Sequence, residues 1–238
     1  MSADKEMGIF EHFNELRVRI FKALIALIIT TLASFFFSDQ LIQILARPIG
    51  GTTKLISIEV TENIGVFMRV SLLTGFIIAL PVILYQLLAF IMPGLTDTEK
   101  RWVYMGIPVA SVLFLLGVSF AYFIMLPTAL PFLISFLTGV ETTPRLSNYF
   151  AFVTNLLFWI GISFETPVIV FLLAKLGLVT PKMLLKYWRY AILVIAVIAA
   201  IVTPTPDPVN MGILMVPLIG LYFLSILFAL FARRKKKE

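Results

Sequence analysis

The chain has 238 residues, of which 60% are hydrophobic and 13% are charged, and its mean hydropathy is +1.02. This composition leaves no room for a separate soluble domain, so we expect a single membrane domain over residues 1–238, with short loops. The sequence contains no cysteine, which excludes a disulfide framework, a thiol nucleophile and any cysteine-ligated metal centre. An isoelectric point of 9.6 is compatible with nucleic-acid binding, but the basic residues stand beside apolar blocks, where they set membrane topology.

Six long apolar blocks follow one another along the chain, and we expect each of them to form a transmembrane helix. Five reach or exceed the roughly 17–20 residues that a helix needs to cross a ~30 Å hydrocarbon core. The fifth has only 13 residues and would have to cross as a short span with the bilayer thinned around it. The expected fold is an all-α integral membrane protein with six spans, the fifth and sixth short, at residues 20–37, 66–92, 102–126, 149–176, 190–202 and 209–231.

Lysine and arginine are concentrated in alternate gaps between these blocks. If the N-terminal segment, the gaps 93–101 and 175–189, and the C-terminal tail share one side, that side holds 15 of the 19 Lys and Arg residues. By the positive-inside bias, both termini are then expected in the cytoplasm. Pro and Gly residues in the two longest segments of the other side, 38–65 and 127–148, should break those segments into short interfacial helices and turns.

Residues suited to catalysis are scarce. The only histidine is His12, which precedes the first block, so a Ser–His dyad inside the bilayer has no base. The run Gly161-Ile162-Ser163 lacks the second glycine of a nucleophile motif. The sequence has neither a phosphate-binding glycine-rich loop with lysine nor an H-E-x-x-H motif. We therefore expect no enzyme activity, no catalytic residue, no cofactor and no metal site.

Glu165 is the one polar residue that topology does not explain. It lies 16 residues into the fourth block, roughly 24 Å along a helix at ~1.5 Å per residue, and is therefore deep in the membrane. Pro167 cannot donate to the Ser163 carbonyl, so we expect an unpaired acceptor beside Glu165, with Thr166 adjacent. A carboxyl at this depth is either satisfied within its own bundle or marks a functional cavity. A proton-coupled secondary transporter using Glu165 is the alternative function, although a single acid makes a poor proton relay.

Two carboxylates stand at the membrane border on the side that is otherwise basic. Glu15 precedes the first block, and Glu99 follows the second. For Glu15 the local alternative is an ion pair with Arg19 at i+4, and for Glu99 it is a first-turn carboxylate favoured by the helix dipole. The spacing leaves these alternatives as open as a functional role. Two separated acidic points on one membrane face could also receive a paired cationic ligand.

Several motifs, taken in chain order over nearly the whole sequence, closely resemble the TatC family, the multispanning core of the twin-arginine translocase. The matching motifs are His12–Arg19 (H-x-x-E-L-R-x-R), Pro81–Gln86 with Ala89-Phe90 and Pro93-Gly94-Leu95, Glu99-Lys100-Arg101, Phe120–Phe123 with Pro127, Phe164-Glu165-x-Pro167, and Thr203-Pro204 near Asp207. The sequence departs from many relatives at Leu88, where they carry Trp, and its Thr-Pro-Thr-Pro-Asp spacing is a residue longer than in some.

The resemblance implies a concave six-helix scaffold that receives the signal peptide of a folded cargo at the cytoplasmic face. It implies that the residues matching Glu15 and Glu99 bind the twin arginines, and that the surrounding surface includes Leu16, Arg17, Arg19, Phe90, Lys100 and Arg101. It further implies that Glu165 faces an intramembrane cavity whose other polar side chains are Gln86, Ser163 and Thr166. Helix breaks and loops are expected at Pro48, Pro81, Pro93, Pro167 and Asp207.

The resemblance also implies the partners and the location. Single-span TatA-like and TatB-like subunits are expected on the fifth and sixth spans, and self-association is expected in a multi-subunit receptor complex. Transport is expected to use the proton gradient across a bacterial cytoplasmic membrane. The expected partners are therefore signal peptides, these subunits and the lipid bilayer, and nucleic acid is not among them.

Overall fold

A computed structural model describes residues 9–92, 95–135, 143–202 and 208–232. Pro93 and Asp207, two of the residues expected to shape loops, lie outside these ranges. The described residues are helical apart from turns and one isolated β-bridge, which confirms an all-α fold in this part of the chain. Their elements, in chain order, are α1 (Ile9–Phe35), α2 (Ser38–Ala46), η1 (Arg47–Ile49), η2 (Thr52–Lys54), α3 (Glu62–Ile91), α4 (Asp97–Phe120), η4 (Ala121–Met125), α5 (Leu126–Ser135), α6 (Leu146–Phe164), α7 (Thr166–Lys175), α8 (Pro181–Lys186), α9 (Trp188–Val202) and α10 (Pro208–Ala232).

Five of the described helical segments are long and apolar enough to cross a bilayer, and each coincides with one of the apolar blocks. These segments need helical backbone because hydrocarbon offers no partner for a free N–H or C=O group. The helix of the fifth block, α9, has 15 residues, which is about 22 Å and less than a ~30 Å core. The sixth, α10, has 25 residues, so the expectation of a short sixth span is wrong. The predicted bounds, 209–231, differ from those of α10 by one residue at each end, and Pro208 is tolerated as the first residue of the helix.

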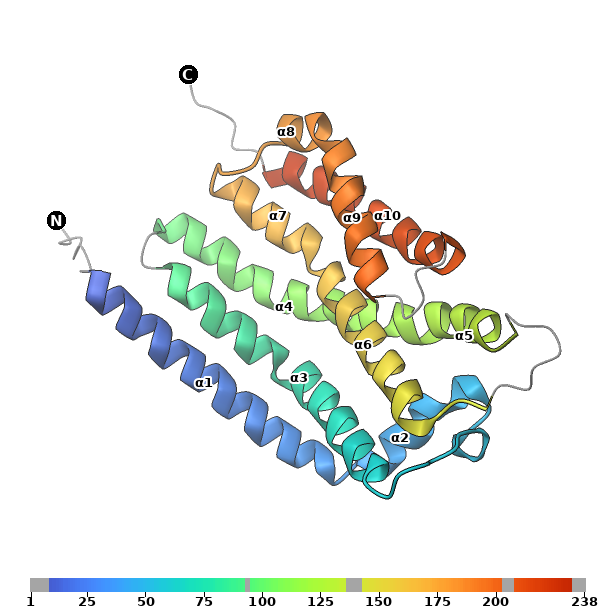
Figure 1. Cartoon of the computed structure of the whole chain (residues 1–238). Coiled ribbons are helices and arrows are strands. Elements are labelled where there is room, and N and C mark those ends of the chain that lie inside the picture. Colours follow the sequence, from blue (N-terminus) through green and yellow to red (C-terminus); the bar gives the residue numbers. More distant parts are fainter. Residues whose placement is uncertain (1–8, 93–94, 136–142, 203–207, 233–238) are drawn as a thin grey trace.

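Basic residues gather at one end of the helix bundle. The start of α1, the end of α3, the start of α4, the end of α7, α8 and the end of α10 gather at one end of the molecule, at the upper left of Figure 1. We call this the basic end because the described cations there are Arg17, Arg19, Lys22, Lys100, Arg101, Lys175, Lys182, Lys186 and Arg189. The short helices α2 and α5 lie at the opposite end, which confirms that these two long segments break into short helices.

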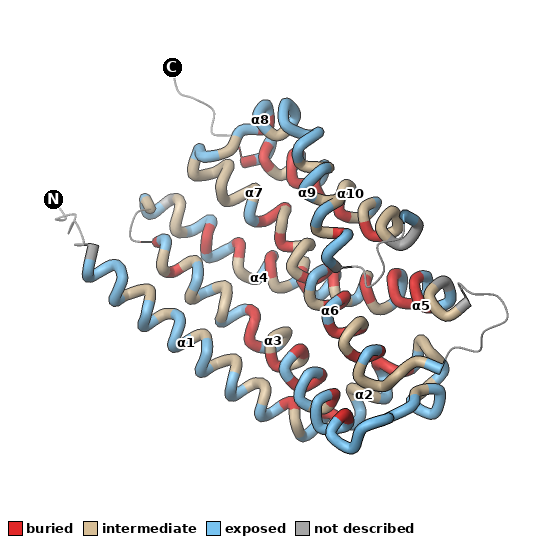
Figure 2. The backbone as a smooth tube through the Cα atoms, in the orientation of Figure 1, coloured by how far each residue is buried: buried red, intermediate tan, exposed pale blue. Residues whose placement is uncertain are grey.

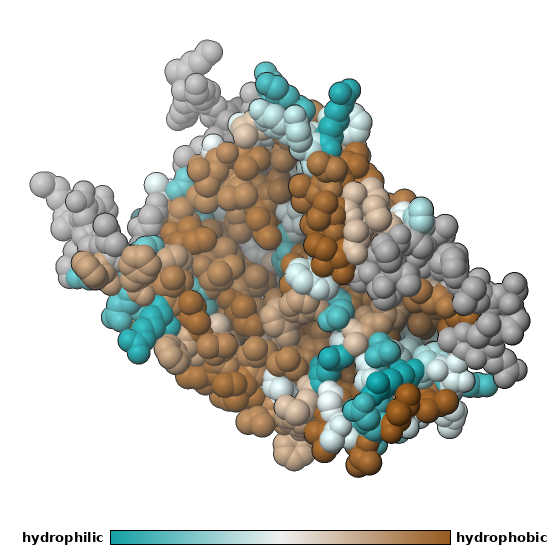
Figure 3. All heavy atoms as spheres, viewed as in Figure 1, coloured by the Kyte–Doolittle hydropathy of each residue, from teal (hydrophilic) through white to brown (hydrophobic). Residues whose placement is uncertain are grey.

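The core is formed mainly where α3, η4, α5, α6 and α10 meet, and α1 lies on its outside, as Figure 2 shows. Leu126, Phe150 and Leu214 are fully or almost fully buried there. Elsewhere large apolar side chains are exposed along most of each long helix, and they cover most of the face seen in Figure 3. Such extensive exposure of apolar surface fits a protein surrounded by lipid rather than by water.

Close approaches between the described helices depend on glycines, among them Gly75, Gly117 and Gly161. At Gly75, a side chain would overlap the backbone of Thr31, so α1 and α3 can touch only because this residue has no Cβ atom. Thr30 Oγ1 donates to the Gly75 carbonyl at 2.8 Å across the same contact. At Gly161 on α6, a Cβ atom would overlap the ring of Phe114 on α4. These contacts fix α1 and α6 against their neighbours and so hold the ends of the helices in register.

The opposite end is held together by polar contacts between segments distant in sequence. Tyr122 and Tyr149 donate hydroxyl hydrogen bonds to the carbonyls of Ile44 (2.7 Å) and Leu45 (2.8 Å), which tie α2 to the helices behind it. The Arg145 guanidinium bonds Glu59 at 2.7 Å and also Glu62, whose side chain is almost completely buried. Hydrogen bonds to Glu59 and Glu62 raise the pKa of Arg145 above its usual value, so it is charged at any physiological pH.

Candidate functional site

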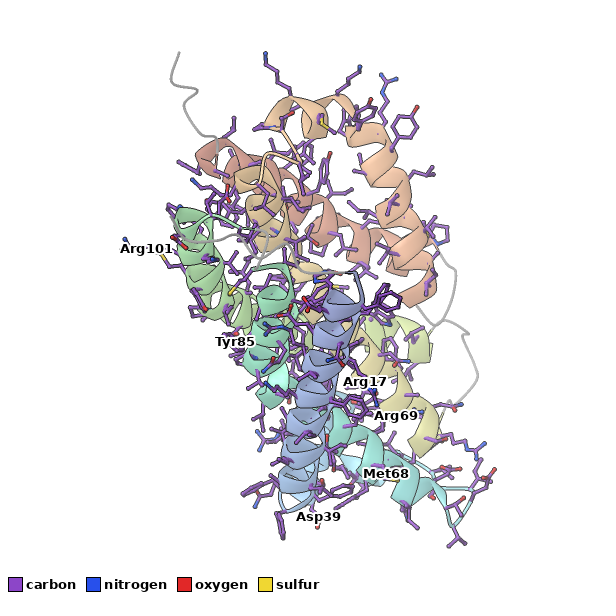
Figure 4. All side chains as sticks on the ribbon, turned by 90° about the vertical axis from the view of Figure 1, so that its left-hand side faces the viewer. Arg17, Asp39, Met68, Arg69, Tyr85 and Arg101 are labelled. Atoms are coloured by element: carbon purple, nitrogen blue, oxygen red, sulfur yellow. The ribbon has the colours of Figure 1, made fainter. Side chains whose placement is uncertain are left out.

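The candidate site is built at the basic end from the start of α1, the end of α3 and the start of α4. These three elements lie next to one another in Figure 1, and α1 and α3 are in extensive contact. Arg17 on α1 and Arg101 on α4 lie toward this end, whereas Asp39 lies at the other (Figure 4). The elements that carry the expected peptide-binding residues are therefore assembled at one end of the bundle.

Glu15 lies in the first turns of α1 and is bound on one side only. Both Nε and Nη2 of Arg19 donate to Glu15 Oε1, with Nε at 2.9 Å, so the expected i+4 ion pair is present. Glu15 Oε2 is buried and accepts no hydrogen bond, while His12 Nδ1 lies 4.0 Å from it. The carboxylate therefore retains capacity for a further donor, and a buried acceptor without a partner costs about 1–3 kcal/mol.

His12 links this carboxylate to α3. Its imidazole stacks on the ring of Phe90, with the ring centroids 4.2 Å apart and the planes 20° from parallel. This contact brings Phe90 beside the Glu15 segment, as expected for two residues of one surface.

A groove runs from this site along α1 and α3. It has a volume of about 300 Å³ and its upper part is lined by Leu16, Arg19, Gln86, Leu87 and Phe90. Below them the lining is apolar: Ile20, Ala23, Leu24, Leu27, Phe76 and Ile83. Gln86 Oε1 is a buried acceptor without a hydrogen-bond partner. The structure thus places Gln86 in this groove on α3, together with Leu16, Arg19 and Phe90.

Glu99 is tied to the start of its own helix. Its Oε2 accepts hydrogen bonds from the Thr96 backbone N–H (2.9 Å) and the Thr96 hydroxyl (2.8 Å), which makes a capping box at the N-terminus of α4. The first-turn alternative for Glu99 is therefore realised. Lys100 pairs with Asp97 at 3.3 Å, and Arg101 is exposed. Glu99 also borders a cavity of about 550 Å³ toward α7 and α8, where Lys175 and Lys182 are cations that the sequence did not single out.

Glu165 stands at a break between two helices rather than inside one. The helix α6 ends at Phe164, α7 begins at Thr166, and Pro167 occupies the first turn of α7, where its missing N–H is tolerated. The Glu165 side chain is only 5% exposed, and its Oε1 accepts no hydrogen bond. Ser163 donates its hydroxyl to the Trp159 carbonyl at 2.7 Å and so serves its own helix. Glu165 lies outside the groove that contains Gln86.

The remaining expected residues have local roles in the backbone. Pro48 lies in the short helix η1. Pro81 lies inside α3, which continues through it, so the break expected at Pro81 is wrong. Within the described residues no three His, Asp or Glu side chains come close enough together to hold a metal ion. The geometry at the basic end thus offers a half-occupied carboxylate above an apolar groove, a combination that suits an elongated ligand with a cationic part and an apolar part.

Comparisons with known proteins identify the family to which the chain belongs. Residues 11–217 match the sequence model of a family described as Sec-independent protein translocase protein (TatC). The chain is 40% identical over 239 residues to the Sec-independent protein translocase protein TatC of Aquifex aeolicus, covering 98% of each chain. It is 39% identical over 221 residues to the chloroplastic TATC protein of Pisum sativum, covering 92% of this chain and 63% of that protein. The chain thus spans less than two thirds of the length of this plant relative.

The fold has a close counterpart among solved structures. The crystal structure of a twin-arginine translocase receptor, TatC, superimposes with a TM-score of 0.81 at 38% identity, covering 94% of this chain and all of that one. A second crystal structure of such a receptor, in the detergent DDM, gives a TM-score of 0.82 at 37% identity, covering 91% and 98%. At these identities the similarity extends beyond the fold to the sequence.

Proposed function

Because the chain belongs to the TatC family of Sec-independent protein translocases, we propose that it is the receptor and scaffold subunit of a twin-arginine translocase. In this role the basic end faces the cytoplasm of a bacterium and binds the twin-arginine signal peptides of folded proteins. The excess of Lys and Arg at that end supports this orientation. The short helix α9 crosses a locally thinned bilayer as the fifth of six spans in one membrane domain.

The observation that carries the proposal is the one-sided pairing of Glu15. Arg19 occupies Oε1, and Oε2 is buried, partnerless and close to His12. A guanidinium bound to Oε2 would leave the Arg19 bonds to Oε1 in place, although the side chains that cover Oε2 in the free protein have to move aside for it. A hydrogen bond to a charged group contributes roughly 1.5–3 kcal/mol. A lysine ammonium matches such a site less well because it lacks the planar, forked arrangement of donors. This gives a physical reason for a preference for arginine.

In this proposal the second carboxylate, Glu99 at the start of α4, binds the other arginine of the pair. Its Oε2 is already bound by Thr96, so the residue serves both the helix cap and the ligand. The fixed cap holds the carboxylate in place, which reduces the entropy lost when a second arginine binds. Leu16, Arg17, Phe90, Lys100 and Arg101 form the surface around the two acids.

The groove between α1 and α3 is proposed to take the apolar part of the signal peptide. It begins at Leu16 and Arg19, next to Glu15, and becomes wholly apolar toward Leu27 and Phe76. An apolar peptide helix gains from burial there, whereas its charged start remains at the membrane border. Single-span TatA-like and TatB-like subunits dock on α9 and α10, several copies of the chain assemble, and the proton gradient drives transport.

Photocrosslinking tests this proposal with folded, purified protein. A photoreactive residue at position 16 or 87, both in the groove, should crosslink a twin-arginine peptide and should crosslink a twin-lysine peptide at least tenfold less. The control is position 115, an exposed leucine on α4 outside the groove, which should crosslink neither. Equal labelling by the two peptides, or labelling at 115 as strong as at 16, would refute the receptor role.

A further inference from the structure

A second groove opens between α4, α7 and α10, away from the α1–α3 groove. It has a volume of about 330 Å³ and is lined only by apolar side chains and one glycine; among them are Trp102, Gly106, Val109, Val168, Phe171 and Phe231. Trp102, Val109 and Phe231 are themselves exposed, so the groove opens sideways, toward the surroundings of the helices. For a membrane protein these surroundings are lipid.

A cation stands at the mouth of this groove. The Lys175 ammonium nitrogen lies 4.4 Å from the centre of the Trp102 ring and 5.8 Å from that of Phe171. Lys175 is the last residue of α7, and no ion pair of it occurs in the described part of the chain. A contact with ring faces leaves ammonium donors for another acceptor. Arg101, the residue before Trp102, lies at the same end of α4 and points away from the bundle (Figure 4).

The depth of the groove limits what can occupy it. Seven residues separate Trp102 from Val109 on α4, and seven separate Val168 from Lys175 on α7, which is about 10 Å of helix in each case. Half of a ~30 Å hydrocarbon core is about 15 Å, so the groove is confined to one leaflet. A transmembrane helix from another subunit would need a contact surface through both leaflets. A hydrocarbon chain from one leaflet matches the groove in depth and polarity.

We propose that this groove holds an acyl chain of an anionic phospholipid from the leaflet at the basic end, with the lipid phosphate bound to Lys175. The apolar lining takes the chain, and the cation selects the headgroup. Trp102 lies at the level where aromatic side chains favour the membrane border, and it contacts both parts of the lipid. Neither Lys175 nor Trp102 belongs to the residues assigned to the signal peptide, while Lys175 also lines the cavity that Glu99 borders.

Tryptophan fluorescence gives a direct test because Trp102 lines the groove. The variant Trp159→Phe/Trp188→Phe leaves Trp102 as the single tryptophan. It is reconstituted in phosphatidylcholine with a small fraction of phosphatidylglycerol carrying brominated acyl chains, which quench a nearby indole. The reference measurement uses the same fraction of brominated phosphatidylcholine. We expect the anionic lipid to be enriched about fivefold at Trp102, which corresponds to ~1 kcal/mol for one basic side chain near the surface.

Three further variants separate specific binding of the anionic lipid from general electrostatic attraction. Lys175→Gln should remove the headgroup preference, whereas Lys186→Gln, the same change on α8 at the same end, should keep it. Val109→Phe fills the groove without changing any charge and should reduce quenching by the anionic lipid to the level of the zwitterionic one. Circular dichroism and gel filtration of each variant check that it is folded.

Three outcomes would overturn the proposal. The first is equal quenching of Trp102 by the two lipids in the parent protein. The second is a headgroup preference that survives in both Lys175→Gln and Val109→Phe, which would indicate only a diffuse accumulation of anionic lipid. The third is loss of lipid contact at Trp102 whenever a single-span subunit is reconstituted with the chain, which would make the groove a docking site for protein.

Discussion

Arg19 places two of its donors on a single oxygen of Glu15 and leaves the other oxygen, Oε2, buried without a hydrogen-bond partner. A pair of this kind at i and i+4 on a helix adds only about 0.3–0.5 kcal/mol to stability. The same carboxylate can contribute more to binding, because the desolvation of Oε2 has already occurred in the free protein. The arrangement therefore favours a role in ligand binding over a role in folding.

Substitution of Glu15 should affect peptide binding far more than stability. Glu15→Ala removes one charge-assisted contact, so the affinity for a twin-arginine peptide should fall roughly tenfold to a hundredfold at ~1.4 kcal/mol per decade. Glu15→Lys should be worse, since repulsion is added to the lost contact. Titration of fluorescent peptide into detergent-purified protein measures both effects.

Arg19→Gln is the matched control for Glu15. It breaks the same ion pair but leaves the carboxylate, so it should weaken binding less than Glu15→Ala does. The receptor assignment of Glu15 fails if Glu15→Lys binds the peptide as the parent does and discriminates equally against a twin-lysine peptide. It also fails if Arg19→Gln and Glu15→Ala lower the affinity equally, because the ion pair itself would then be the relevant feature.

Two substitutions of Glu99 separate the effect of its negative charge from the effect of its hydrogen bonds in the capping box. Glu99→Gln keeps an acceptor for the Thr96 N–H and hydroxyl, while Glu99→Ala removes it. We expect Glu99→Gln to retain the melting temperature and lose about tenfold in peptide affinity, and Glu99→Ala to lose about 1 kcal/mol of stability as well. Full peptide affinity in Glu99→Gln would show that Glu99 only caps α4.

The sequence predicted the helices well because apolar blocks in a membrane protein leave the backbone no other solution. The bounds predicted for the sixth span, 209–231, agree with α10 to one residue at each end, and only its description as short is wrong, because a helix of this length can cross a ~30 Å core. The break at Glu165 was predicted as a missing hydrogen bond beside Pro167 and as a helix break at Pro167. In the structure the chain divides there into two helices, and their packing against α4 and α10 is a tertiary feature that spacing does not reveal.

In the candidate site, contacts within one helix were predictable from the sequence, and contacts between helices were not. The Glu15–Arg19 pair and the first-turn position of Glu99 follow from spacing along a helix, and both are present. The stacking of His12 on Phe90 joins residues 78 positions apart and has no local signal. The presence of Gln86 in the α1–α3 groove depends on the close approach at Gly75, which only a three-dimensional structure shows.

At the opposite end, Arg145 should matter for stability and not for peptide binding. Its guanidinium joins the loop before α6 to Glu59 and Glu62, and removing it leaves the buried Glu62 carboxylate uncompensated. Arg145→Gln should therefore lower the melting temperature clearly, and Arg145→Gln/Glu62→Gln should regain part of the loss. Since the pKa of Arg145 is raised, its contribution is present below its usual pKa and declines only above about pH 12.

Thermal unfolding of the purified variants checks this. The control is Lys54→Gln, a change of an exposed residue in the segment that leads to Glu59 and Glu62. The contribution of Arg145, taken as the difference in melting temperature between parent and Arg145→Gln, should be the same at about pH 7 and about pH 9. If Glu59→Gln destabilised the protein as much as Arg145→Gln, the buried position of Glu62 would not be the cause.

Glu165 should be required for transport as a polar group and dispensable for folding. Its Oε1 is buried and unpaired, so Glu165→Leu removes an unsatisfied acceptor and should leave the melting temperature within a few degrees of the parent. Export of a twin-arginine cargo by cells carrying Glu165→Leu should nevertheless fall strongly. Glu165→Gln should export nearly as the parent does, because an amide still offers a hydrogen-bonding group to a partner or to water, while a full charge at this depth is costly.

The measurement is export of a reporter cargo together with the melting temperature of each purified variant. If Glu165→Gln abolished export as completely as Glu165→Leu, the carboxyl would have to ionise or carry a proton, and the proton-coupled transporter alternative would gain support.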